Sequence, residues 1–148
     1  MKIEEEIIQS KFRNAHHKAI VNLIFTSNWF NTRQQEFLKP YGITGQQFNI
    51  LRILKGQNGA SISATAIKSR MLDKNSDVSR LLDRLEAKEL IEKKTCPSDK
   101  RAADVTITAK GLDVLAEIDK KQKEADGIIS LSEAEATQLS DLLDKCRG

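Results

Sequence analysis

The residues of this sequence best suited to bind another molecule lie between positions 75 and 111. The spacing of apolar residues predicts a helix over residues 75–88. Its polar face carries four hydrogen-bond donors: Ser76, Ser79, Arg80 and Arg84. Hydroxyl and guanidinium groups on an exposed helix can donate to base edges and phosphates in a DNA groove. The pattern therefore indicates contact with DNA, although charged faces are also common on helices that contact only solvent.

Asp77 stands in the first turn of the same predicted helix, and two roles are open to it. A carboxylate repels phosphate, but it can accept a hydrogen bond from the amino group of a cytosine. Alternatively, it caps the free N–H groups at the start of the helix. Its position in the first turn favours the cap.

A charged ribbon is expected directly after this helix. Residues 91–95 and 104–107 are predicted strands, and residues 96–103 are predicted to be their loop. We expect Arg101 at or near the tip of the loop, where it can enter a DNA minor groove because that groove attracts cations. Asp99 can hold this guanidinium in position through a charge-assisted hydrogen bond. A helix followed at once by a basic ribbon is a compact DNA-binding unit.

Other helices must position this unit. The buried face of the helix over residues 75–88 is formed at positions i, i+3, i+4 and i+7 by Val78, Leu81, Leu82 and Leu85. Further helices are predicted over residues 3–38, 44–55, 61–70, 108–126 and 132–145, with room for a residue or two of strand before the third of these. The order predicts one domain over residues 1–148, mainly α with a small antiparallel β-ribbon.

Local signals mark several ends of these helices. Two capping boxes are expected, Thr44 with Gln47 and Ser132 with Glu135. Thr108 is expected to cap the helix that follows the ribbon. A break is possible around residues 14–17, and the turn at residues 39–42 ends the first helical region.

Charge is distributed unevenly along the chain. The net charge is +3, but residues 1–111 hold 19 Lys and Arg against 12 Asp and Glu, whereas residues 112–148 hold 5 against 9. A basic part is suited to an anionic partner such as DNA. The acidic C-terminal part is expected to point elsewhere.

The composition excludes several other classes of protein. Cys96 and Cys146 are too few for a disulfide framework, and no metal-ligand spacing occurs. No catalytic triad, P-loop or glycine-rich phosphate loop is visible, so we expect neither an enzyme nor a cofactor. The N-terminus is acidic and has no secretory signal, and no apolar stretch is long enough to span a bilayer. A cytoplasmic protein without a membrane partner is expected.

Four segments carry a pattern more specific than a bare helix-turn-helix. They are SRLLDRLEAKELIEKK (79–94), DKR (99–101), VTITAKG (105–111) and LKPYGITGQQFNILRIL (38–54). Together they closely resemble MarR-type winged-helix transcription regulators, and the helix order matches that family over about residues 18–145. The resemblance rests chiefly on the D-x-R wing motif combined with the recognition-helix pattern.

The resemblance implies a winged helix-turn-helix with N- and C-terminal dimerisation helices. Residues 1–38 and 109–148 would form the dimerisation helices, and residues 44–107 the DNA-binding lobe. Two such lobes in a homodimer would straddle a pseudo-palindromic operator in double-stranded DNA. The implied function is a sequence-specific transcriptional regulator, most simply a repressor that a small-molecule effector releases from DNA.

The family resemblance also assigns roles to individual residues. The residues implied to face the major groove are Ser76, Asp77, Ser79 and Arg80. Arg101, supported by Asp99, is implied to enter the minor groove. The implied phosphate contacts are Arg84, Lys93 and Lys100. Two residues depart from the family pattern, because Asp77 replaces a Thr or another small polar residue and Glu89 replaces a turn Gly.

Members of this family commonly respond to a small, often aromatic, ligand held between the dimer helices and the lobe. The candidate lining residues are Phe25, Trp29, Phe30 and Tyr41. Aromatic residues at helical spacing are also ordinary core or interface residues, and this interpretation stays open.

Two alternatives to an effector-controlled DNA-binding protein remain. Cys96 lies among the cations of the predicted ribbon, which favour a thiolate, so the chain can be a redox-responsive regulator. An ordinary cysteine at a strand end is the simpler interpretation. A winged helix can also bind protein and no DNA, but the clustered basic residues argue against that alternative.

Overall fold

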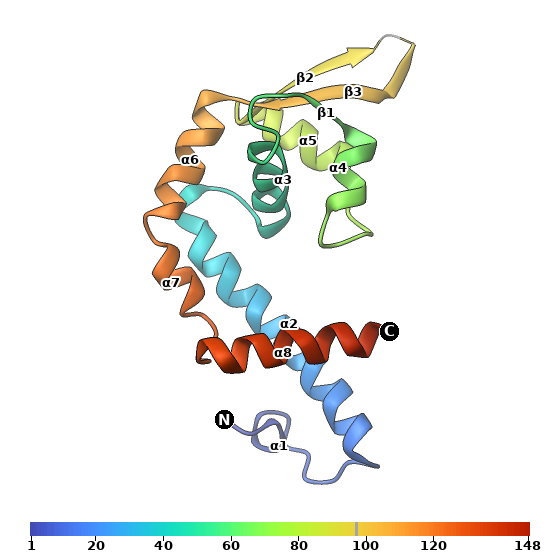
Figure 1. Cartoon of the computed structure of the whole chain (residues 1–148), viewed down its shortest axis with the longest axis vertical. Coiled ribbons are helices and arrows are strands. Elements are labelled where there is room, and N and C mark those ends of the chain that lie inside the picture. Colours follow the sequence, from blue (N-terminus) through green and yellow to red (C-terminus); the bar gives the residue numbers. More distant parts are fainter. Residues whose placement is uncertain (97) are drawn as a thin grey trace.

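The computed structural model describes residues 1–96 and 98–148, and the side chains of all of these except residues 95, 96 and 99–102. A winged-helix lobe lies at one end, a long helix leads from it to the N-terminus, and an arm of helices leads to the C-terminus (Figure 1). The lobe contains α3 (Gly45–Lys55), β1 (Ile62–Ser63), α4 (Ala64–Arg70), α5 (Val78–Ala87), β2 (Ile91–Cys96) and β3 (Asp99–Ile107). The mainly helical fold with a small antiparallel sheet is as predicted.

The N-terminal helices are α1 (Ile3–Glu6) and α2 (Ala15–Leu38), followed by the short 3-10 helix η1 (Lys39–Tyr41). The C-terminal arm contains α6 (Ala109–Asp119), α7 (Gln122–Asp126) and α8 (Glu133–Arg147). The possible break in the first helical region is confirmed, because α2 begins only after Asn14, whose side chain accepts a hydrogen bond from the backbone N–H of His17 at 2.9 Å. Gly42 ends η1 with φ of 69°, a left-handed conformation that glycine adopts without steric strain.

The sheet has three antiparallel strands in the order β1-β3-β2. Ile62 pairs with Val105 on one side of β3, and Ile91 pairs with Ile107 on the other. The ribbon strands are longer than predicted, because β3 begins at Asp99 and not at residue 104. The prediction of a loop over residues 96–103 is therefore wrong, since strand pairing continues to Cys96 and Asp99.

The hydrophobic core lies inside the lobe, between α3, α4, α5, the sheet and α6. Its most completely buried side chains are Leu38, Ile50, Leu51, Leu54, Ile67, Met71, Leu82, Leu85, Ile91, Val105, Leu115 and Ile118. All four residues of the predicted stripe on α5 are buried, at 0–6% exposure. The expected capping boxes of α3 and α8 and the Thr108 cap of α6 are confirmed.

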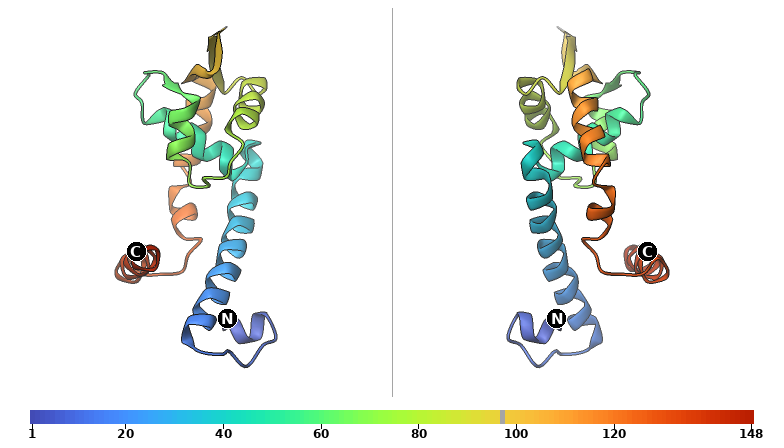
Figure 2. Two further views of the ribbon diagram at one scale, coloured as in Figure 1. Left: turned by 90° about the vertical axis from the view of Figure 1, so that its right-hand side faces the viewer. Right: turned by 90° about the vertical axis from the view of Figure 1, so that its left-hand side faces the viewer.

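The arm leaves the lobe through a turn. The prediction of one continuous helix over residues 108–126 is wrong, because Lys120 and Lys121 separate α6 from α7. Lys121 has φ −106° and ψ 24°, outside the helical region. Beyond this turn, α8 lies well apart from α2 (Figure 2).

Apolar side chains remain exposed on both extensions. On α2 they are Ile20, Leu23 and Ile24, and on α8 they are Leu139 and Leu142. No residue of α7 or α8, all of which the structure describes, is buried. In the part of the chain that the structure describes, no helix combines the length and the hydropathy needed to cross a bilayer.

Candidate nucleic-acid interface

Helix α5 begins at Val78, three residues later than the sequence predicts. Asp77 is its N-cap, and the carboxylate accepts a hydrogen bond from the backbone N–H of Arg80 at 3.2 Å. The capping role that the sequence favours for Asp77 is therefore confirmed. Its oxygen satisfies a helix N–H group that otherwise has no intrahelical partner.

Ser76 does not lie on the outward face of α5, and the expectation of an exposed Ser76 is wrong. Its residue exposure is 3%, because it belongs to the turn that precedes the helix. The hydroxyl donates to the backbone oxygen of Asp73 at 2.7 Å and accepts from Gln46 Nε2 at 3.2 Å. Ser76 thus connects the turn before α5 to α3, and the helical spacing used to orient it does not apply outside the helix.

The exposed face of α5 carries the remaining predicted donors. Ser79, Arg80 and Arg84 are all exposed, opposite the buried leucines of the same helix. Three donors thus lie along one side of a helix whose other side is fixed in the core. The antiparallel strands β2 and β3 project beside this helix (Figure 1).

Lys93 lies between the ribbon and the helix. Its ammonium group donates to Asp83, and it is 3.9 Å from Glu86 Oε1. Its side chain is only 19% exposed, and its backbone N–H donates to Glu86 Oε2 at 3.1 Å. The sequence expectation was a phosphate contact, but in the structure the charge of Lys93 is balanced by carboxylates of α5 and its contacts join β2 to that helix.

The wing residues are only partly described. Asp99, Lys100 and Arg101 are the first three residues of β3, so Arg101 is in a strand rather than in a loop. Their side chains, and that of Cys96 at the end of β2, lie outside the described part of the chain. The proposed pairing of Asp99 with Arg101 and the thiolate character of Cys96 therefore stay predictions.

The turn between α5 and β2 contains a residue in an unusual backbone conformation. Glu89 has φ of 62°, and the backbone N–H of Leu90 donates to Leu85 O at 3.0 Å across the helix end. This left-handed turn is one that glycine usually forms. Glu89 is therefore under strain, and its carboxylate is 3.6 Å from Lys110 Nζ on α6.

Lys88, at the C-terminus of α5, makes contacts that no sequence pattern predicts. Its ammonium group donates to Gly42 O at 2.6 Å and to Gln47 Oε1 at 2.9 Å. Gln47 is 2% exposed and also belongs to the capping box of α3. Lys88 thus joins the recognition helix to the turn between α2 and α3, over a sequence separation of 41 residues to Gln47.

The structure brings together only two of the four candidate effector residues. Phe25 and Trp29 line a cavity of about 160 Å³ with N-terminal residues that include Met1 and Ile3. Tyr41 packs instead against Phe37 and the core, with ring centroids 6.2 Å apart. Phe30 is half-buried and does not line this cavity.

A larger depression lies where α2 meets η1 and α3, and sequence reasoning missed it. Its volume is about 440 Å³, and its lining includes Lys39, Ile43 and Thr44. Gly42, whose carbonyl accepts from Lys88, also lines this depression. The turn that holds the C-terminus of α5 is thus one wall of the cavity.

Residues 43–103 match the model of the MarR family, a segment that runs from the start of α3 to β3. The match covers the helix-turn-helix and most of the ribbon. Relatives and solved structures of the same family match most of the chain. Over residues 43–103 the chain therefore resembles the MarR family of winged-helix transcriptional regulators.

One curated relative of this chain is the HTH-type transcriptional regulator MhqR of Bacillus subtilis (strain 168). It is 27% identical over 117 residues, which span 78% of this chain and 79% of the relative. A cysteine-to-serine mutant of MarR from E. coli, solved in complex with operator DNA, has a TM-score of 0.72 at 25% identity over 99% of each chain. The organohalide-sensing regulator RdhR-CbdbA1625, bound to 2,4-dichlorophenol, has a TM-score of 0.78 at 20% identity, over 94% of this chain and 85% of the other.

The two residues that depart from the MarR-type pattern have structural consequences. The carboxylate of Asp77 caps α5, and its hydrogen bond from the backbone N–H of Arg80 holds the side chain at the start of the helix. Glu89 occupies a glycine-type conformation, which strains the turn that leads into the ribbon. The apolar stripe on α5 is buried, and Ile91 pairs with Ile107 directly after the strained turn.

Proposed function

We propose that the protein is a cytoplasmic, homodimeric repressor that binds a pseudo-palindromic operator and releases it when a small aromatic effector binds. The observation that carries the DNA-binding part is the outward face of α5. Ser79, Arg80 and Arg84 are exposed together, on a helix capped by Asp77 and fixed by its buried leucines. Serine and arginine donors on such a face are suited to base edges and phosphates in the major groove.

The assigned contacts differ in what they do. Ser79 and Arg80, in the first turn of α5, are placed to read bases because the N-terminal residues of a recognition helix meet base edges. Arg84, one turn later, is placed to bind phosphate. Arg101 and Lys100 on β3 are proposed as minor-groove and phosphate contacts, with Asp99 orienting Arg101.

The experiment is selection of bound fragments from random duplex DNA, followed by affinity titrations at several salt concentrations. Affinity should fall steeply with salt because phosphate contacts release counterions. Arg80→Ala should relax the preference at one base position, whereas Arg84→Ala should weaken binding to all sequences alike. Lys123→Ala on α7 is the matched control, since it removes one exposed positive charge away from α5. Recovery of no duplex by selection, or equal effects of all three substitutions, contradicts the assignment.

The dimer is proposed from the exposed apolar residues of α2 and α8. Ile20, Leu23 and Ile24 recur at helical spacing on α2, and Leu139 and Leu142 do so on α8. Apolar residues gathered on the exposed side of a helix are typical of an interface. Sedimentation should show a dimer, and Ile24→Asp with Leu142→Asp should shift it to the monomer.

The effector is proposed to bind in the cavity lined by Phe25 and Trp29. The phenol bound to RdhR-CbdbA1625 supports an aromatic ligand for a protein of this fold. Trp29 is the only tryptophan, so its fluorescence reports directly on the cavity. Titration with chlorinated phenols should quench this fluorescence and lower the affinity for DNA, and Phe25→Ala should weaken both effects. Quenching that leaves DNA affinity unchanged contradicts effector control at this cavity.

A reporter gene placed behind the selected operator tests repression. Expression should fall when the protein is present and recover when the effector is added. Expression that rises with the protein identifies an activator instead.

A further inference from the structure

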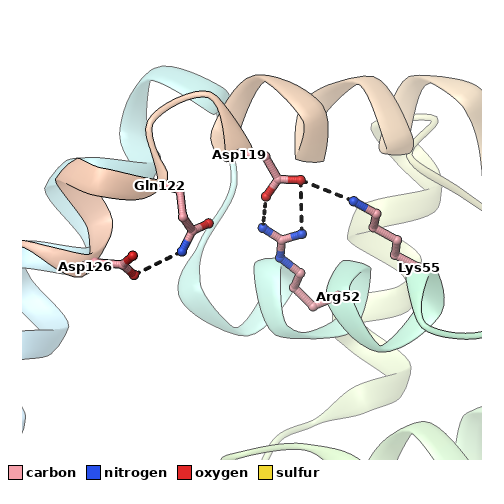
Figure 3. Close-up of polar contacts among 5 residues, drawn as sticks. All are labelled: Arg52, Lys55, Asp119, Gln122 and Asp126. Atoms are coloured by element: carbon pink, nitrogen blue, oxygen red, sulfur yellow. Dashed lines mark hydrogen bonds and ion pairs between the residues drawn. The ribbon is translucent and has the colours of Figure 1, made fainter. Parts of the chain in front are cut away.

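The last residue of α6 carries a cluster of charges that the proposed DNA contacts do not use. The carboxylate of Asp119 accepts from both terminal nitrogens of Arg52, one of them at 3.5 Å, and from Lys55 Nζ at 3.2 Å (Figure 3). Arg52 and Lys55 lie in the last turn of α3. The cluster therefore joins the DNA-binding lobe to the point where the chain leaves it for the arm.

The charges of this cluster suit α3 but not α6. Cations stabilise a helix C-terminus and anions do not, so Arg52 and Lys55 are favourable in the last turn of α3, whereas Asp119 opposes the dipole of α6. α6 has no basic residue in its own last turn. Hydrogen bonds from Arg52, more than those from Lys55, hold the pKa of the Asp119 carboxyl below its ordinary value. Asp119 is thus stabilised by α3, across the contact between the two helices.

Arg52 is itself oriented from a second side. Its guanidinium carbon is 5.0 Å from the ring centroid of Phe48, one turn earlier on α3. A guanidinium fork that contacts an aromatic ring on one side and a carboxylate on the other has little rotational freedom. The geometry of the pair is therefore directional, in contrast to a lysine point charge.

Asp119 lies between the part of the arm that packs on the lobe, α6, and the part that has no buried residue, α7 and α8. Ile118, 2% exposed, is the last buried residue of α6. The turn at Lys120 and Lys121 follows directly, and neither α7 nor α8 has a buried residue. The side chain of Asp119 is consequently the last one that the lobe holds before the chain turns.

We infer that the cluster of Arg52, Lys55 and Asp119 is a positioning device that fixes the angle at which the C-terminal arm leaves the lobe. The functional part of this inference rests on the proposed function. If α8 joins two chains, this angle sets the separation of the two α5 helices. Dimers of helix-turn-helix proteins bind half-sites at a fixed spacing. The cluster is therefore a determinant of which half-site spacing the protein accepts.

Breaking the cluster should change orientation much more than folding stability. The side chains of Arg52 and Asp119 are 31% and 37% exposed, and partly exposed ion pairs contribute little to stability. The test variants are Arg52→Gln and Asp119→Asn. The matched control is Glu117→Gln, which makes the same carboxylate-to-amide change near the turn but removes only the exposed pair with Lys120.

The first measurement needs no DNA. Cys146 on α8 is free and exposed and can carry one spin label, and Lys68→Cys on α4 can carry the second, in a Cys96→Ser background. Labelled chains are diluted into unlabelled protein so that only distances within one chain are recorded. The distance distribution between lobe and arm should be narrow in the parent and in Glu117→Gln, and broad or shifted in both cluster variants. Unchanged narrow distributions in Arg52→Gln and Asp119→Asn overturn the positioning role.

The second measurement uses the selected operator with base pairs added or removed between its half-sites. The parent and Glu117→Gln should lose affinity by at least about tenfold for each change of spacing. The cluster variants should lose about threefold or less, with a lower best affinity. Identical spacing profiles for all four proteins overturn the role in half-site selection. Failure of every protein to bind DNA refutes the proposed function. The distances between the labels still decide whether the cluster fixes the angle of the arm.

Discussion

Lys88→Met is expected to destabilise the protein even though Lys88 is an exposed residue on the surface of the lobe. Methionine keeps most of the aliphatic stem but removes the ammonium group, and with it the hydrogen bonds to Gly42 O at 2.6 Å and Gln47 Oε1 at 2.9 Å. The substitution therefore tests the polar link between the end of α5 and the start of α3, with little change in packing.

The magnitude follows from the burial of the two acceptors. A hydrogen bond from a charged donor contributes about 1.5–3 kcal/mol when it is shielded from water. Gly42 is exposed, so water replaces that bond at little cost, whereas Gln47 is 2% exposed. Gln47 Oε1 keeps its hydrogen bond from the backbone N–H of Thr44 at 3.1 Å, so it does not become unsatisfied. The expected loss in the free energy of unfolding is about 1–2 kcal/mol.

Urea unfolding at one fixed protein concentration measures this loss, because a dimer's stability depends on concentration. Lys110→Met is the matched control, since its ammonium group contacts only exposed Glu89 at 3.6 Å, and it should change the free energy of unfolding by less than about 0.5 kcal/mol. In a Gln47→Met background the effect of Lys88→Met should shrink by about 0.5–1.5 kcal/mol. Equal effects of the two Lys→Met changes, or full additivity with Gln47→Met, refute the reasoning.

Three further predictions concern the ends of α5 and α6. Glu89→Gly should raise the free energy of unfolding by about 0.5–1 kcal/mol. At φ of 62° the strain energy relieved by removing the side chain exceeds the free-energy cost of the greater entropy of glycine in the unfolded chain. Glu89→Ala should not raise it, and urea unfolding of both variants checks this. Gly111→Ala should lower the free energy of unfolding by about 2 kcal/mol or more in the same assay. The added Cβ would collide with Leu90 O and approach Ile107 Cγ1 to 2.7 Å. The pKa of Asp119 is lowered chiefly by hydrogen bonds from Arg52, so its stabilisation is present above the ordinary carboxyl pKa and is lost as the pH falls through the lower folded-state pKa. The stability difference between the parent and Asp119→Asn, measured by urea unfolding at pH 7 and pH 3, should therefore shrink at the lower pH.

The features that the sequence predicts correctly are those determined within a few residues. The caps at Thr44, Thr108 and Ser132 depend on a side chain and a backbone N–H three positions away. The buried leucines of α5 follow from helical periodicity alone. The sequence also predicts the cap at Asp77 correctly, because the partner of its carboxylate is the backbone N–H three residues later.

Two of the errors, and one omission, concern contacts between different elements that no pattern within a single element shows. Helical spacing predicts Ser76 on the face of a helix, but its hydrogen bond from Gln46 spans 30 residues and holds it in the preceding turn. Residues 99–103 look like a polar loop in the sequence, but β3 runs through them because its pairing with β2 extends to Asp99. The contacts of Asp119 with Arg52 and Lys55 span 67 and 64 residues, and no local pattern announces them.

Helix α3 connects α5 to the C-terminal arm, the two parts of the molecule whose relative position matters for the proposed function. Its N-terminal turn holds α5 through Gln47 and Lys88, and its C-terminal turn holds the arm through Arg52 and Asp119. Its middle is fixed in the core, with Ile50 and Leu51 at 0% exposure. A helix of 11 residues with one side packed in the core moves as one body, since protein interiors are close-packed and resist local deformation. A displacement of the turn at Gly42, which is a wall of the larger cavity, would therefore reach both the recognition helix and the exit of the arm through the same element. The sequence predicts a surface for contact with DNA, but the contacts that link this surface to the arm through α3 are visible only in the folded chain.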